Sequence, residues 1–288
     1  DGGTIKLDGN YPVGTNNVAL GNTALDDGSL SGGYNTAVGA GSLSANTSGQ
    51  QNASLGAFSL DANTTGSYNA GFGQSSLGSN TTGSNNTGLG RGALSANTTA
   101  SNNTAVGYQA GLSNTTGTYN VAFGRSALAA NTTAGYNSAL GADALVTNTT
   151  GSENVAVGYN ALNANSTGVK NTALGASALL SNTTAERNTA VGYQAMYTNQ
   201  TSKYNTAVGY RSGYFQTGGE RNVSMGYTSL YNSTTGASNV ALGTDAMFHS
   251  TTGSYNVAVG KAALQSNTTA SNNTAVGYQA GLSNTTGT

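Results

Sequence analysis

One pattern of polar and apolar residues repeats along almost the whole chain with a period of 17 residues. Each copy begins with Asn (position 0) and continues with a variable residue, a small residue, a bulky apolar residue and Gly at position 4. Position 8 is Leu or Met in most copies, and position 11 is mostly Asn followed by Thr-Thr or a close variant. Such self-similarity identifies a repeat protein. The opening residues are Asn17, Asn35, Asn52, Asn69, Asn86, Asn103, Asn120, Asn137, Asn154, Asn171, Asn188, Asn205, Asn222, Asn239, Asn256 and Asn273.

The copy that begins at Asn120 shows which elements the pattern predicts. Its first residues alternate in the period-two manner of a β-strand, with positions 1 and 3 on one face, and position 3 is Phe123. Gly124 suits a sharp corner. Leu128 predicts a second short strand over positions 6 to 9 that carries Leu inward, and Asn131 begins a return turn.

Stacking explains how so short a unit can fold. Seventeen residues cannot bury an apolar face alone, whereas stacked coils can, because each strand pairs in parallel with its copies. The chain is therefore predicted to be all-β, a parallel β-solenoid (β-roll) of sixteen 17-residue coils. In register, Asn103, Val106 and Gly107 would form ladders with their copies, and the Asn at position 0 and the Asn at position 11 would each hydrogen-bond to their own copies in the neighbouring coils.

The repeat also predicts the domain organisation. Residues 17–288 are expected to form a single continuous solenoid, because the copies stay in phase after a first step of 18 residues. Residues 1–16, which hold the one proline, Pro12, are expected to be a lead-in from a preceding segment. The pattern stops within a copy at Thr288, so we expect the solenoid to continue in a longer protein.

The strand motif resembles the Ser/Asn-Val-Ala-Ile-Gly repeat of trimeric autotransporter adhesin heads. The resemblance rests on 120–124, 154–158 and 256–260, and the longer unit 103–117 is similar to repeats in tail-fibre and structural proteins of marine bacteriophages. It implies a left-handed β-roll, three chains packed around one axis, and a surface that binds host matrix or cells. The adhesin repeat is usually shorter than 17 residues, so a single-chain solenoid is the alternative to the homotrimer.

Composition and charge exclude several classes of function. Charged residues are 7% of the chain, the net charge is −1, and no basic stripe or long apolar run is present, so we expect neither nucleic-acid binding nor membrane insertion in this segment. There is no cysteine and one histidine, and the acidic residues are scattered. We therefore expect no enzyme, no metal and no cofactor, and interpret His249 as a surface residue and Asp26-Asp27 as a solvated turn.

The pattern breaks most clearly in the coils that begin at residues 188, 205, 222 and 239. Position 9 is aromatic in all four, and charged residues gather nearby. Two interpretations stay open: a contact patch for carbohydrate or protein, or aromatic filling of a gap between coils or chains. The candidate patch consists of Tyr197, Tyr214, Tyr231, Phe248, Arg211 and Arg221.

These observations predict an extracellular, non-enzymatic fibre shaft or adhesin. It would be a phage tail fibre or a cell-surface adhesin that mediates attachment to a surface glycan or protein receptor. One alternative is a self-assembling filament whose subunits join end to end, since an uncapped solenoid end is an exposed sheet edge. The other is an ice- or polysaccharide-binding solenoid.

Overall fold

The computed structural model describes residues 15–287, and the described part is all-β, with sixteen three-residue strands and no helix. The predicted fold class is confirmed: the chain is a parallel β-solenoid with one strand per 17-residue coil. It divides after Ala142 into two compact units. Residues 1–14 of the expected lead-in lie outside the described residues.

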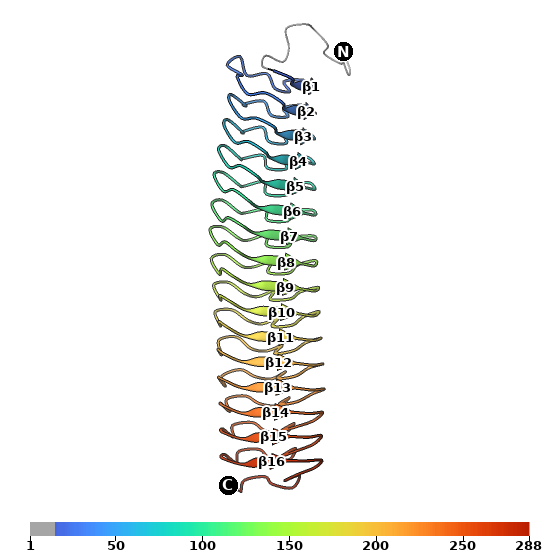
Figure 1. The fold of residues 1–288 in the computed structure, drawn as a ribbon, viewed down its shortest axis with the longest axis vertical. Coiled ribbons are helices and arrows are strands. Elements are labelled where there is room, and N and C mark those ends of the chain that lie inside the picture. The colour runs from blue at the N-terminus through green and yellow to red at the C-terminus, as the bar shows by residue number, and fades with distance from the viewer. Residues whose placement is uncertain (1–14, 288) are drawn as a thin grey trace. The chain divides into compact units, whose positions relative to one another are not determined.

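The first unit contains eight strands, each paired in parallel with the next (Figure 1). The register is that of the sequence repeat, so that Thr104 pairs with Val121 and Val106 with Phe123. The strands are β1 (Val18–Leu20), β2 (Thr36–Val38), β3 (Ala53–Leu55), β4 (Ala70–Phe72), β5 (Thr87–Leu89), β6 (Thr104–Val106), β7 (Val121–Phe123) and β8 (Ser138–Leu140).

The second unit repeats this arrangement with eight further strands in parallel register, for example Thr189 with Thr206. Because each strand has only three residues, the unit is held together by coil-to-coil pairing. The strands are β9 (Val155–Val157), β10 (Thr172–Leu174), β11 (Thr189–Val191), β12 (Thr206–Val208), β13 (Val223–Met225), β14 (Val240–Leu242), β15 (Val257–Val259) and β16 (Thr274–Val276).

Each strand turns its small residue inward and its two larger residues outward. In β7, Ala122 is 2% exposed, whereas Val121 is 42% and Phe123 52% exposed. Positions 1 and 3 share a face, as predicted, and that face points to solvent. We call the position-1 and position-3 side chains of a unit its sheet face.

Positions 6 to 9 form turns and not the predicted second strand, although the prediction that Leu points inward is confirmed. Leu128 is 1% exposed, but its φ is +52° and that of Ser126 is +56°. Alternate residues in the left-handed region bend the chain tightly, which an extended strand cannot do. The neighbouring coil stabilises this unusual backbone, since the Ser126 amide donates to the carbonyl of Tyr108.

Two ladders of buried asparagines confirm the predicted hydrogen bonding between copies. At position 11, Asn97 Nδ2 donates to Asn80 Oδ1 (2.8 Å) and to the Ala100 carbonyl in its own coil (3.0 Å). At position 0, the Asn103 amide donates to Asn86 Oδ1 (3.0 Å), and Asn103 Nδ2 closes the coil on the carbonyl of Gly117 (2.9 Å). Because buried polar side chains are normally hydrogen-bonded, these ladders help to fix the register of the coils.

The core between the ladders is narrow. It consists mainly of Leu or Met at position 8 and of Ala or Ser at positions 2 and 7, with Gly at position 2 in two coils. Where position 8 is Gly111, a small cavity lies between Leu94 and Leu128, and the neighbouring Leu112 is only half-buried. The side chain of Leu112 does not take the vacant place.

Candidate functional site

The four position-9 aromatics of the second unit form a continuous stack. Ring centroids are 5.1 Å apart from Tyr197 to Tyr214, 5.2 Å from Tyr214 to Tyr231 and 5.0 Å from Tyr231 to Phe248. The ring planes lie within 1°, 16° and 2° of parallel. We refer to these four rings as the aromatic stack.

Stacking limits what these four side chains can bind. The rings are half-buried, and each inner ring has both faces covered by its neighbours. Burial raises the pKa of the Tyr214 phenol, the neighbouring Tyr197 adds to the increase, and Arg211 opposes it. A ligand can therefore reach mainly the edges and hydroxyl groups of these rings. This arrangement favours the interpretation that the rings fill a gap between coils.

Arg211 lies with the aromatic stack, as the sequence grouping implied. Its guanidinium carbon is 5.4 Å from the ring centroid of Tyr214 and 5.2 Å from that of Tyr210. Nε donates to Gln194 Oε1 over 2.8 Å. Tyr210 belongs to a second stack at position 5, with Tyr193 at 5.5 Å and Tyr227 at 5.2 Å. Arg211 therefore bridges two rows of aromatic rings by cation–π contacts.

Arg221 makes its contacts in a different group of residues. Its guanidinium carbon lies 5.5 Å from the ring centroid of Tyr204, and Arg187 lies over the same ring at 5.7 Å. Lys203 bonds Glu186 at 2.9 Å, and this hydrogen bond lowers the pKa of the Glu186 carboxyl. Of the two arginines in the candidate patch, Arg211 therefore contacts the aromatic stack, whereas Arg221 lies in a charged cluster at positions 15 and 16.

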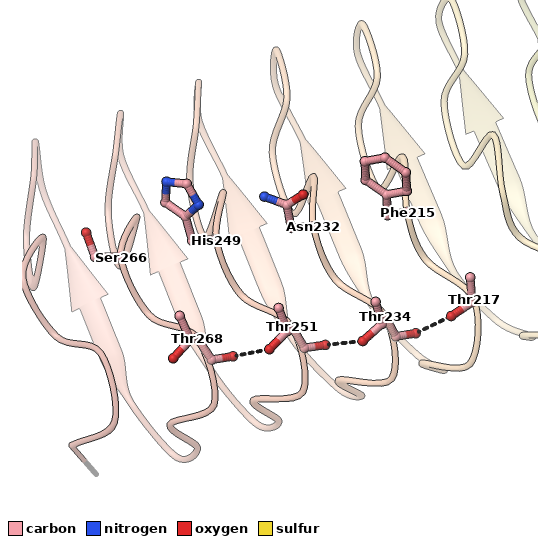
Figure 2. A pocket seen from close by; sticks show the side chains of 8 residues that line it. All are labelled: Phe215, Thr217, Asn232, Thr234, His249, Thr251, Ser266 and Thr268. Carbon is pink, nitrogen blue, oxygen red and sulfur yellow. Dashed lines mark hydrogen bonds between the residues drawn. The ribbon is translucent and has the colours of Figure 1, made fainter.

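A groove beside the aromatic stack was missed by the sequence analysis. It has a volume of about 680 Å³ and runs between the position-10 and position-12 side chains of four coils (Figure 2). Phe215 and His249 line it at position 10. In the coils that begin at residues 35 to 188, position 10 holds only Ala, Ser or Thr, which is the signal that could have identified both residues. The lining residues are Phe215, Thr217, Asn232, Thr234, His249, Thr251, Ser266 and Thr268.

The position-11 ladder is interrupted in the coils that form this groove. Asn is replaced there by Gln216, Ser233 and Ser250. Gln216 still reaches the carbonyl of Gly219 over 2.8 Å, whereas the buried hydroxyls of Ser233 and Ser250 have no hydrogen-bond partner. An unbonded buried hydroxyl is destabilising, so we expect these coils to be less stable than the regular coils.

Restoring the ladder should stabilise the second unit. The double substitution Ser233→Asn/Ser250→Asn gives each coil an amide that can donate to its own position-14 carbonyl and to the position-11 side chain of the preceding coil, as Asn97 does. We expect a gain of about 2 kcal/mol in unfolding free energy, read from denaturant or thermal unfolding. The exposed Ser283→Asn is the control, with an expected change below about 0.5 kcal/mol. An unchanged or lower stability of the double variant contradicts this account.

Comparison of the chain with family models, with curated proteins and with solved structures found no match. The class of protein rests on the geometry alone: a parallel β-solenoid repeat protein. Within residues 15–287, His, Cys, Asp and Glu nowhere gather in the threes that a metal ion would need. A search of the same residues found no helix with the length and apolar character to cross a membrane.

Proposed function

We propose that the chain is a shaft segment of an extracellular, non-enzymatic fibre in which three copies pack through their sheet faces. The fibre would belong to a phage tail or a cell-surface adhesin and would hold or present a surface that attaches to a receptor. The observation that supports this proposal is the row of exposed apolar position-3 side chains on the sheet face of both units.

The sheet face is uncharged, and its position-3 residue is apolar in every coil. In the first unit, Leu55, Leu89 and Phe123 are 48%, 46% and 52% exposed, and in the second unit Leu174 and Met225 are 46% and 48% exposed. Positions 1 and 3 contain no charged residue in any copy. A contiguous exposed surface of this kind marks a site of association, because a soluble monomer rarely leaves so many bulky apolar side chains in water.

Another copy of the chain is the partner that fits best. Position 3 of the sheet face is apolar in every coil, so an identical face matches it along the whole length of a unit. The number three and the left-handed coil come from the resemblance of the strand motif to adhesin heads. In such an assembly the sheet faces would form the large core that the narrow interior of each coil lacks.

The ice-binding alternative gains no support from the threonines at position 12. Their hydroxyls are used between coils: Thr234 donates to the carbonyl of Thr251, and Thr251 to that of Thr268, each over 3.1 Å. The outward position 1 varies among Thr, Val, Ala and Ser, so it does not present a regular hydroxyl grid either.

Charges placed on the sheet face should separate the copies. We expect Leu174→Lys/Met225→Lys to reduce the molar mass in sedimentation equilibrium from three chains to one while circular dichroism still reports folded coils. A lysine buried in an apolar interface has no partner for its charge, whereas on the surface of a monomer it remains hydrated.

The matched control adds two lysines outside the sheet face. Tyr255 is 66% exposed at position 16, a position that is Lys170 in another coil, and Asn272 is exposed at the same position. Tyr255→Lys/Asn272→Lys should leave the molar mass unchanged. If Leu174→Lys/Met225→Lys keeps the mass of the unsubstituted chain, association through the sheet face is wrong.

A further inference from the structure

We propose that the groove lined by Phe215, Asn232, His249 and the position-12 threonines binds an extended, uncharged β-1,4-linked glycan chain. The inference rests on the proposed attachment role, which it makes specific by naming a site and a ligand class. The site lies entirely within the second unit, and none of its side chains belongs to the sheet face.

The rings of Phe215 and His249 are turned differently from those of the aromatic stack. Phe215 lies at 79° to Tyr214 and 87° to Tyr231, with ring centroids 4.7 and 5.3 Å apart. His249 lies at 80° to Phe248, 4.8 Å away. Figure 2 shows both rings turned broadly toward the viewer above the row of threonines. They therefore offer ring faces to solvent, which the stacked rings cannot do, and Phe215 is 40% exposed.

The spacing of the two ring faces fits alternate sugars of one glycan chain. Phe215 and His249 are two coils apart, which at the usual distance between paired strands is about 10 Å. In an extended β-1,4-linked chain each pyranose is turned over relative to the one before it, so every second ring presents the same face. Two sugar units of such a glycan span a length similar to the distance between Phe215 and His249. One glycan chain lying along the groove could thus place alternate rings on Phe215 and His249.

The polar groups of the groove suit the hydroxyls of such a chain. In the described part of the chain, the side chains of Asn232, His249 and Ser266 have no hydrogen-bond partner, so their polar atoms are available to a ligand. Asn232 lies in the coil between the two rings, where the edge of the intervening pyranose would pass.

The opposite wall and the charge of the groove favour an uncharged ligand. Thr234 and Thr251 direct their hydroxyls along the ladder to the next coil, and Figure 2 shows their methyl carbons pointing toward the position-10 row. No Lys, Arg, Asp or Glu lines the groove. An apolar floor with a few free amide and hydroxyl groups is typical of sites for small neutral ligands, and an anionic polysaccharide would find no countercharge here.

The aromatic stack has a defined part in this arrangement, since it backs both ring faces. Tyr214 and Tyr231 contact Phe215, and Phe248 contacts His249. Because the rings of Phe215 and His249 are packed against the stack, they lose little conformational freedom when a sugar packs on them, and this increases the affinity. The stack is thus a positioning element, and the binding faces are those of Phe215 and His249.

The test is a titration of the full chain with cellohexaose and chitohexaose, which share the linkage and differ in the acetamido group. We expect one or both hexamers to bind. Maltohexaose, with α-1,4 linkages, and the disaccharide cellobiose, which covers one ring, should each bind at least about tenfold more weakly. If neither β-1,4 hexamer binds, or if maltohexaose binds as tightly, the proposal is wrong.

Two variants connect the binding to the groove. Phe215→Ala/His249→Ala should weaken hexamer binding at least about tenfold, and it should fold, because Ala occupies position 10 in several regular coils, among them Ala96 and Ala130. Tyr255→Ala removes an exposed ring at position 16 and should leave the affinity unchanged. Undiminished binding by the double variant overturns the proposal.

A measurement on the unsubstituted chain does not depend on the folding of any variant. The hexamer should shift the NMR methyl signals of Thr234 and Thr251, and shifts confined to residues outside the groove would show that the glycan binds elsewhere. Because the ligands are soluble oligosaccharides, failure of this test leaves the fibre proposal to be judged by its own molar-mass measurements.

Discussion

Replacing Gly107 with Ala should destabilise the first unit by about 3–5 kcal/mol. The φ of Gly107 is +134°, a conformation that L-residues rarely adopt, and an added Cβ would lie 2.5 Å from the carbonyl oxygen of Gly124 in the next coil. That oxygen belongs to a paired backbone, so it cannot move away without breaking the register of both coils. Thermal or denaturant unfolding followed by circular dichroism measures the loss.

The control for this prediction is a glycine in the same unit with room around it. An added Cβ at Gly28 meets no atom within 4 Å, so Gly28→Ala should change the unfolding free energy by less than about 0.5 kcal/mol. Equal stabilities of the two variants would show that the close approach of successive position-4 glycines does not hold the coils in place.

Replacing Asn97 with Ala should have the next largest effect, a loss of about 3 kcal/mol. The substitution removes the bonds from Nδ2 to Asn80 and Ala100, and it also removes the acceptor of the 2.9 Å bond from Asn114. Buried polar groups are left unpaired on both neighbouring coils, which costs more than the mean value of a hydrogen bond. Unfolding in urea, monitored by circular dichroism, gives the free energy.

Thr116, exposed at position 13 of the adjacent coil, provides the comparison. Thr116→Ala deletes a side chain of similar size without touching either ladder and should cost less than about 0.5 kcal/mol. If Asn97→Ala is no more destabilising than Thr116→Ala, the asparagine ladder is not what stabilises the stack.

The sequence predicts the coil-to-coil architecture well because the repeat itself carries the information. The period gives the register of β6 and β7, the alternation gives the strand, and the buried Asn ladders follow from stacking identical residues. It does not say which face of the strand is inside, since a period of two is the same for both faces. The small Ala122 points inward because the coil is narrow there, and Phe123 is left outside.

Two features lie beyond what local sequence signals can indicate. The left-handed conformations of Ser126 and Leu128 are imposed by pairing with neighbouring coils, whereas the usual markers of that conformation are Gly and Asn.

The groove was missed for a different reason. Position 9 is aromatic in four successive coils, which indicates the aromatic stack. Position 10 deviates in three successive coils by three different residues, Asn232 and the rings of Phe215 and His249. Their importance depends on ring orientation, which only the three-dimensional structure shows.

In the proposed fibre, two separate parts of the outward surface would serve association and glycan binding. The sheet face would join copies to one another, and the groove would remain open to a ligand, so the irregular coils can specialise without disturbing association. The replacement of the ladder Asn by Ser233 and Ser250 fits this division, because residues that serve binding are often kept at the expense of stability.

The most direct test of the central claim is the molar mass of the unsubstituted chain by sedimentation equilibrium over a wide concentration range. One chain has a mass of 28.4 kDa, and association of three copies through the sheet faces predicts three times that value. A mass of a single chain at all concentrations, with the coils folded by circular dichroism, would contradict the account.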